Sequence, residues 1–198
     1  MKKYYAVKLG KKPGIYNTWE ECRRQVSGYS GAQYKSFTNV DEAKDFISKD
    51  SKRDKLLDQD GLLVYVDGSF NVHTKEYGYG CVVIENQKVV KEMYGKGSHE
   101  DYVSMRNVSG EIFGCQVAIE YAIAQGYPRV YIYYDYEGIE KWAIGAWKTN
   151  KIGTIAYAKK IKEFRQQIEI HFIKVLAHSG DIYNERADQL AKKAIGIK

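Results

Sequence analysis

Four acidic residues of this 198-residue chain lie beside apolar stretches instead of among the mixed surface charges. Two follow hydrophobic runs of strand character and two adjoin the apolar stripes of helices: Asp67, Asp135, Glu111 and Asp188. Four carboxylates in one neighbourhood would repel one another strongly unless cations lay between them. Hard oxygen ligands with room for water favour Mg²⁺, with Mn²⁺ as a substitute. If the fold brings these residues together, the sequence predicts a divalent-metal site.

The first acid closes a stretch that is typical of a buried central strand. Residues 62–66 are all apolar or aromatic, which suits a strand covered on both faces. An isolated Asp before Gly68 more often opens a turn, so Asp67 alone carries little weight. Residues 129–134 form a second such run, which closes on Asp135. Because α/β folds build their sites at strand ends, we expect both carboxylates there.

Two helices are expected to carry the other two acids. Between residues 107 and 125, apolar residues recur at spacings of four and three until Gly126, and Glu111 stands at the edge of this stripe. The stripe comprises Val108, Ile112, Cys115, Ile119 and Ala122. A final helix over residues 183–195 has its own buried stripe of Ala and Leu, with Asp188 beside it.

The elements between these four complete a domain over residues 61–198. We expect strands at 77–85 and 89–94, helices at 137–147 and 155–167, and an edge strand at 169–175. The predicted order is βββαβααβα, which belongs to the α/β class. Residues 48–60 are rich in mixed charges with little to bury, so they are predicted to form a linker.

The first 47 residues are predicted to form a small α+β domain of order ββαβα. The pattern places strands at 4–9, 15–16 and 32–37, a capping box at Thr18 and Glu21 before a helix to Val26, and a second helix after residue 39. Residues 1–50 contain ten Lys or Arg against six acids, and thus +4 of the chain's +6. Aromatic residues alternate with these cations, a composition that fits nucleic-acid contact, although about half of the rings are expected in the core.

Composition excludes several classes of protein. A hydrophobic content of 44% with 28% charged residues is that of a globular chain, and no apolar run approaches a membrane span of about 18 residues. The N-terminus lacks the apolar length of a signal peptide, so we expect a cytoplasmic protein. Nothing indicates an obligate protein partner. Cys22, Cys81 and Cys115 are widely spaced and are predicted to be buried thiols, neither disulfides nor zinc ligands.

Residues 1–47 resemble the hybrid-binding (viroplasmin-like) domain that precedes the catalytic domain in many type 1 ribonucleases H. The resemblance rests on Tyr5-Ala6-Val7, Pro13-Gly14-Ile15-Tyr16, Thr18-Trp19-Glu20-Glu21-Cys22 and Tyr34-Lys35-Ser36-Phe37. It implies that Tyr5, Trp19 and Lys35 hold the DNA strand while backbone amides meet RNA 2′-hydroxyls. Ser36 stands where many relatives have a second Lys, which implies a weaker grip on phosphate.

Residues 62 to about 195 resemble the catalytic domain of the same family. Four signatures occur in order: Tyr65-Val66-Asp67-Gly68-Ser69, Gly110-Glu111-Ile112, Tyr133-Tyr134-Asp135, and His178 followed by Asn184-Glu185-Arg186-Ala187-Asp188-Gln189-Leu190-Ala191. The resemblance implies a ribonuclease H-like five-stranded mixed sheet flanked by helices.

The resemblance also implies a reaction: endonucleolytic hydrolysis of the RNA strand of an RNA/DNA hybrid by two metal ions, leaving 5′-phosphate and 3′-hydroxyl ends. One ion would be held by Asp67 and Asp188 and the other by Asp67, Glu111 and Asp135. His178 would aid proton transfer or product release, and Asn107 would touch the minor groove. His73, His99 and His171 are assigned no role.

The chain departs from the family pattern at three places. Residues 71–75 replace the family's Asn-Pro-Gly loop, Tyr136 replaces a Ser after the third acid, and the segment between Trp142 and Ile155 is too short for a basic protrusion. Residues 148–150 are a candidate DNA-phosphate pocket. For Trp142 and Trp147, packing and binding are equally compatible with the sequence.

Other functions stay open at this stage. The first alternative is a catalytically decayed hybrid-binding protein, which the intact set of acids disfavours. The second is a DNA-strand nuclease or transferase on the same sheet. An enzyme without metal is least favoured, because no Ser or Cys lies in a recognisable nucleophile motif.

Overall fold

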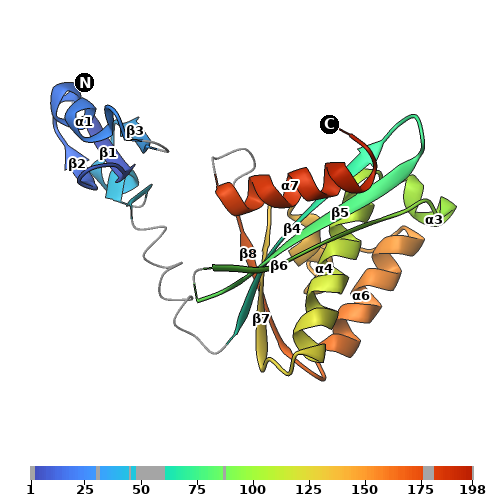
Figure 1. The fold of residues 1–198 in the computed structure, drawn as a ribbon. Helices are drawn as coiled ribbons and strands as arrows, with labels where there is room; N and C mark the ends of the chain where they lie inside the picture. The colour runs from blue at the N-terminus through green and yellow to red at the C-terminus, as the bar shows by residue number, and fades with distance from the viewer. Residues whose placement is uncertain are drawn as a thin grey trace. The chain divides into compact units, whose positions relative to one another are not determined.

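The computed structural model describes residues 3–29, 32–44, 46–47, 61–86, 88–175 and 181–197. The chain divides into two compact units, Met1–Gln59 and Asp60–Lys198 (Figure 1). The predicted linker at 48–60 lies outside the described residues. Among the residues that are described, no helix combines the length and the apolar character needed to cross a membrane.

The first unit is a three-stranded antiparallel sheet with a helix packed on it. Its elements are β1 (Tyr4–Leu9), β2 (Gly14–Tyr16), α1 (Trp19–Val26) and β3 (Gln33–Phe37), and the sheet order is β2-β1-β3. Residues 40–44 and 46–47 are helical as well. The predicted capping box is present, because Thr18 accepts from the N–H of Glu21 while the Glu21 carboxylate accepts from the N–H of Thr18. Val7, Cys22 and Val26 form the buried core between sheet and helix.

The second unit is a five-stranded mixed sheet, as predicted. Its strands are β4 (Leu62–Asn71), β5 (Glu76–Glu85), β6 (Lys88–Gly97), β7 (Arg129–Tyr134) and β8 (Glu169–Lys174), arranged in the order β6-β5-β4-β7-β8. The strand β4 lies in the middle, antiparallel to β5 and parallel to β7. Its central place explains why its first half is apolar at every position.

Helices cover both faces of this sheet (Figure 1). They are α3 (Glu100–Val103), α4 (Asn107–Ala124), α5 (Gly138–Ala143), α6 (Ile152–Phe164) and α7 (Ile182–Ala194). On one face Val64 and Val66 pack into the core that includes Ile112 of α4, and α6 lies beside α4. On the other face Tyr65 packs against Tyr183 of α7.

The structure corrects the expected position of Asp67 at the end of its strand. The strand β4 continues to Asn71, and Asp67 is paired with Gly80 of β5 inside it. What ends near Asp67 is the parallel pairing with β7, whose last partners are Tyr65 and Tyr133. The predicted turn glycine, Gly68, is therefore a strand residue.

The bounds of two helices differ from those predicted from the sequence, because local hydrogen bonds at their ends set where each helix stops or starts. The helix α5 ends at Ala143 and not at residue 147, because Gly145 adopts a left-handed φ of 76° and the N–H groups of Ala146 and Trp147 turn back to the Lys141 carbonyl. The helix α6 starts at Ile152 instead of residue 155, where Thr154 and Lys151 form a cap. The short helix α3 was not predicted; the His99 side chain accepts from the N–H of Asp101 at its start.

Candidate active site

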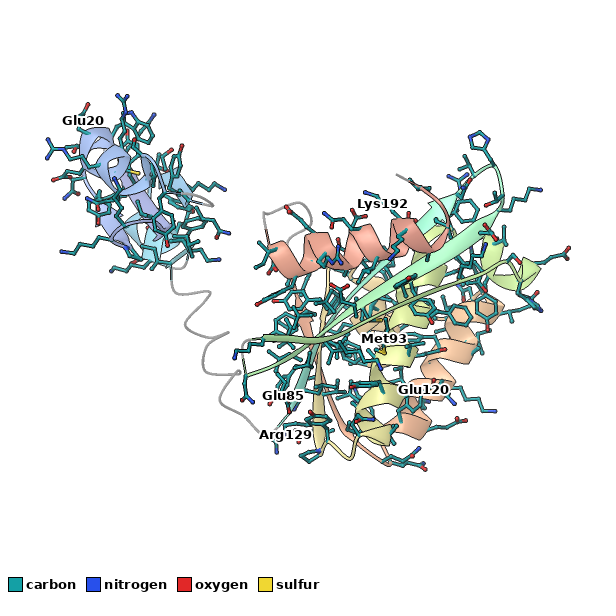
Figure 2. The ribbon with its side chains drawn as sticks, viewed as in Figure 1. Glu20, Glu85, Met93, Glu120, Arg129 and Lys192 are labelled. Carbon is teal, nitrogen blue, oxygen red and sulfur yellow. The ribbon has the colours of Figure 1, made fainter. Side chains whose placement is uncertain are left out.

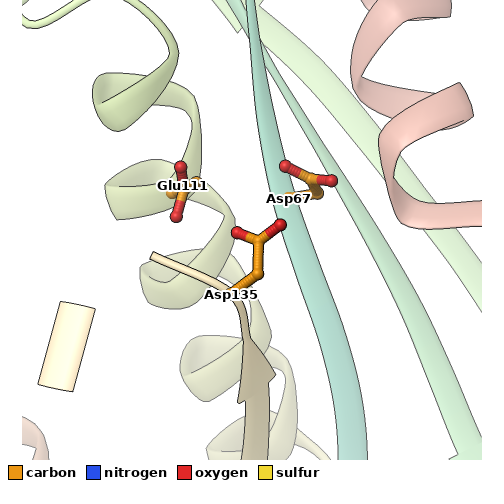
Figure 3. Close-up of side chains that lie close together, drawn as sticks. All are labelled: Asp67, Glu111 and Asp135. Carbon is orange, nitrogen blue, oxygen red and sulfur yellow. The ribbon is translucent and has the colours of Figure 1, made fainter. Parts of the chain in front are cut away.

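Three of the four predicted acids meet at one end of the parallel strand pair. One carboxylate oxygen each from Asp67, Glu111 and Asp135 lies within 4.8 Å of the other two (Figure 3). Asp67 and Asp135 each follow the last parallel pair, Tyr65 and Tyr133, by two residues, so the register of β4 and β7 places them at the same level. Glu111 reaches them from the second turn of α4.

Two glycines allow α4 to approach β4 closely enough for this meeting. A Cβ at Gly68 would lie 2.2 Å from the Asn107 carbonyl oxygen and 2.4 Å from the Glu111 nitrogen. On the helix side, a Cβ at Gly110 would lie 2.0 Å from the carbonyl oxygen of Gly78. Because the backbones of α4 and the sheet are in direct contact at these glycines, Glu111 lies next to the sheet. Asn107, the predicted minor-groove residue, is exposed at the start of the same helix.

Burial and mutual repulsion disfavour the charged forms of these carboxyls. Asp67 is 9% exposed and Glu111 is 2% exposed. Burial, followed by the charge of Asp135, raises the pKa of Asp67 to about 7, although the Gly68 N–H donates a 2.7 Å hydrogen bond to its carboxylate. Burial, Asp135 and Asp67 together raise the pKa of Glu111 well above its usual value.

The donor set fits a divalent metal ion. Within the described residues, Oε2 of Glu111 is buried and accepts no hydrogen bond. A buried, unpartnered acceptor beside two further carboxylates calls for a cation at that point. The ligands are hard oxygens only, which suits Mg²⁺ or Mn²⁺.

The fourth acid, Asp188, lies outside the three-residue group but close enough to raise the pKa of Asp67. Its Oδ2 accepts a 2.6 Å hydrogen bond from Nζ of Lys192, which projects from α7 (Figure 2). Lys192 in turn lowers the pKa of Asp67. Our reading of the sequence did not single out Lys192, although its position four residues after an Asp on a helix is a spacing that forms ion pairs.

The fifth predicted catalytic residue, His178, lies outside the described residues, which resume at Asp181. Asp181 begins α7 by accepting from the N–H groups of Tyr183 and Asn184. Asn184, part of the last signature, is 5% exposed.

In the first unit, the structure brings Tyr5 and Trp19 together and adds a ring that the sequence analysis did not assign. The ring centroids of Tyr5 and Trp19 lie 5.8 Å apart, and those of Trp19 and Tyr34 lie 5.7 Å apart. Trp19 and Tyr34 remain 39% and 46% exposed, so this aromatic cluster is open to solvent. The alternation of strand β3 could have indicated Tyr34, since it shares a sheet face with Val7.

Lys35 does not join this aromatic cluster. It is paired with Ala6, so strand alternation directs it to the opposite face of the small sheet. There its Nζ lies 5.6 Å from the ring centroid of Phe37. The three predicted nucleic-acid contacts of this unit therefore lie on two faces.

Comparisons with known proteins agree with this architecture. The model of the ribonuclease H1 N-terminal domain matches residues 3–47, and the RNase H model matches residues 59–196. Human ribonuclease H1 is 27% identical over 253 aligned positions, which cover 96% of this chain and 88% of the human protein. Ribonuclease H of Saccharomyces cerevisiae is 52% identical over 46 residues, 23% of this chain and 13% of the yeast protein.

The fold of the second unit is also that of a solved relative. The crystal structure of LC11-RNase H1 in complex with RNA/DNA hybrid superposes with a TM-score of 0.57 at 19% identity, over 68% of this chain and 96% of that one. The match of the RNase H model over most of the chain, together with the carboxylate cluster, shows that this chain belongs to the ribonuclease H family and carries the N-terminal domain of ribonuclease H1.

Proposed function

We propose that this chain is an endoribonuclease that hydrolyses the RNA strand of RNA/DNA hybrids with two divalent metal ions, leaving 5′-phosphate and 3′-hydroxyl ends. The observation that carries the proposal is the meeting of Asp67, Glu111 and Asp135 within 4.8 Å, with one buried oxygen unpartnered among the described residues. A structural role alone would not favour three mutually repelling carboxyls at this position.

The four acids would divide between two ions, with Asp67 shared. Asp67 belongs to the cluster with Glu111 and Asp135, and it also interacts electrostatically with Asp188. When bound, the ions supply a water of lowered pKa and stabilise charge on the departing 3′-oxygen. The chain would hold these carboxylates charged and oriented. Asp67 and Asp188 would bind the ion on the side of the attacking water. Asp67, Glu111 and Asp135 would bind the ion on the side of the leaving group. His178 stays a prediction for proton transfer or product release.

Recognition of the hybrid would be shared by the two units. The exposed rings of Trp19 and Tyr34, with Tyr5 beside them, offer a surface on which sugars and bases pack, and Lys35 is an exposed cation on the other face of the same sheet. Asn107 is exposed four residues before Glu111 on α4, and in this proposal it contacts the RNA minor groove. The LC11 relative was crystallised with an RNA/DNA hybrid, which supports this substrate class.

The test is cleavage of end-labelled RNA/DNA hybrid, RNA duplex and DNA duplex in Mg²⁺, Mn²⁺ or EDTA. We expect cleavage of the RNA strand of the hybrid alone, abolished by EDTA and reduced roughly 10²–10³-fold in Asp135→Asn. The matched control is Asp101→Asn, which neutralises an exposed acid of α3 and should cut at the wild-type rate.

A different outcome would favour the alternative function. Tight binding of hybrid without cleavage in either metal would identify a hybrid-binding protein whose site has decayed. Cleavage of DNA duplex at a comparable rate would point to the related DNA-strand nucleases instead.

A further inference from the structure

A buried phenol links the helices α4, α5 and α6. Tyr157 of α6 donates a 3.0 Å hydrogen bond from its hydroxyl to the carbonyl oxygen of Ile139, in the first turn of α5. The same hydroxyl lies 3.3 Å from Sγ of Cys115 on α4. All three residues are fully buried, so this polar link lies inside the core.

The number of protons fixes the direction of both hydrogen bonds. A phenol has one proton, and a carbonyl oxygen can only accept, so the proton of Tyr157 goes to Ile139. The thiol of Cys115 is then the donor to the phenol oxygen. Burial raises the pKa of Cys115 to about 12, so the thiol keeps its proton at neutral pH. The donors therefore run from α4 through Tyr157 to α5.

Each end of this link lies close in the chain to an acid of the cluster. Cys115 follows Glu111 by four residues, about one turn of α4, so the two side chains project from the same face of the helix. At the other end, the N–H of Ile139 donates a 3.1 Å hydrogen bond to the carbonyl oxygen of Tyr136, the residue directly after Asp135. The link thus connects the helix that carries Glu111 with the turn that follows Asp135.

A second phenol holds α5 to the sheet. The hydroxyl of Tyr134, the residue before Asp135, donates a 2.6 Å hydrogen bond to the carboxylate of Glu140 in α5. Tyr134 ties α5 to β7, whereas Tyr157 ties it to α4. The turn after Asp135 is therefore held both to its own strand and to the helix of Glu111.

We propose that Tyr157 is a positioning residue of the metal site, whose hydroxyl keeps Glu111 and Asp135 at the spacing that a divalent ion needs. Loss of a group that supports metal ligands commonly weakens metal binding by roughly 10–100-fold. The inference rests on the proposed function, because it takes these carboxylates to be metal ligands. A hydroxyl that served the core alone would affect stability and leave metal binding unchanged.

The test measures binding of Mn²⁺ to the full chain without nucleic acid, from the electron paramagnetic resonance signal of the free ion. Tyr157→Phe removes the hydroxyl and keeps the ring, and we expect its Kd for Mn²⁺ to rise about tenfold. Cys115→Ala removes the other donor and should have a similar effect. The double variant should bind no more weakly than Tyr157→Phe, because both changes break one link.

The matched control is Ile161→Val, one turn further along α6. Ile161 is fully buried in the same core, so this variant loses packing without changing the link. Its Kd for Mn²⁺ should equal that of the wild type. Thermal unfolding of each variant in EDTA measures how much stability has been lost.

An unchanged Kd in Tyr157→Phe would overturn the proposal. So would an equal rise of Kd in Ile161→Val, since metal binding would then follow the stability of the core. If Tyr157→Phe does not fold, the Kd of Cys115→Ala decides in the same way.

Cleavage of RNA/DNA hybrid by the wild-type chain in Mg²⁺ is measured separately. Saturable binding of Mn²⁺ without cleavage would refute the proposed function, while the Kd values would still report on Tyr157. Absence of Mn²⁺ binding by the wild type would refute both.

Discussion

Asp67 is buried beside two other carboxyls, and the resulting electrostatics link metal binding to folding. The carboxyl that the proposed reaction would need in its charged form lies in an environment that favours the neutral form. The positive charge of Lys192, which donates to Asp188, lowers the pKa of Asp67 in part, but Glu111 remains buried with an unpartnered oxygen among the described groups. A divalent ion would remove the repulsion and stabilise the folded chain.

The metal-free chain is therefore expected to lose stability as the pH rises. The pKa of Asp67 is about 7 when folded and near 4 when unfolded, so the folded state binds the proton more tightly. Protonation of Asp67 therefore contributes on the order of 4 kcal/mol to the free energy of unfolding. This contribution is fully present below about pH 4 and is lost as the pH rises through about 7. Urea unfolding in EDTA at several pH values measures it.

Asp67→Asn provides the comparison, because this variant removes the titrating group while keeping the shape. The unfolding free energy of this variant should fall less between pH 4 and pH 7 than that of the wild type. Mg²⁺ should stabilise the wild type more at pH 8 than at pH 5. If the unfolding free energies of the two proteins changed with pH in parallel, the titration of Asp67 would not be the cause of the expected loss of stability.

At the scale of elements, the contact between α4 and β4 decides whether the acids meet. The backbones touch at Gly68 and Gly110, and Glu111 follows the second of these directly. Sequence patterns predicted the strand and the helix separately, but the pattern led us to interpret Gly68 as a turn residue. Only the packed structure shows that this glycine is required for close approach.

Gly68→Ala should therefore impair both stability and activity. Its Cβ would lie within 2.4 Å of two backbone atoms of α4, so the helix must shift and carry Glu111 away. We expect the unfolding free energy to fall by about 2–3 kcal/mol and cleavage of hybrid to fall with it. Chemical denaturation and steady-state cleavage measure the two effects.

Gly114→Ala is the matched control on the same helix. Its Cβ would meet no atom closer than 3.4 Å, and Ala favours a helix over Gly by about 1 kcal/mol. This variant should be as stable as the wild type or more so. Equal losses of stability and activity in Gly68→Ala and Gly114→Ala would show that the close approach of α4 to β4 at Gly68 is unimportant.

At the scale of the whole molecule, the proposed function assigns substrate binding to one unit and cleavage to the other. The first quarter of the chain holds most of the excess positive charge and an exposed aromatic cluster, whereas the acids lie in the second unit. Joining a binding unit to a catalytic unit raises the effective concentration of the second on whatever the first has bound.

Loss of the first unit's aromatic contact should consequently weaken substrate binding and leave the chemical step intact. Trp19→Ala removes the central ring between Tyr5 and Tyr34. We expect KM for hybrid to rise roughly tenfold or more, with kcat nearly unchanged, since stacking contributes about 1–3 kcal/mol per base. Steady-state kinetics on a long hybrid separates the two constants.

Tyr29→Ala is a suitable control, because Tyr29 is 41% exposed in the same unit and lies outside the aromatic cluster. A similar rise of KM in both variants, or a fall of kcat in Trp19→Ala alone, would argue against this division of labour.

The sequence alone was enough to predict the types and order of nearly all elements, the α/β class and the acids that could bind metal, whereas the five-stranded mixed sheet was implied by the family resemblance. These follow from periodicity, capping and short motifs, which act over a few neighbouring residues; the capping box at Thr18 and the stripe of α4 are examples. The roles of the individual site residues stay predictions.

Tertiary structure alone decided which of these groups meet. It placed Asp67 inside a strand, engaged Asp188 with Lys192, separated Lys35 from Trp19 and joined α4 to α5 through Tyr157. Each depends on strand register or on the distance at which a helix packs on its neighbour. Those quantities are set by contacts between segments far apart in the chain, so no local pattern specifies them.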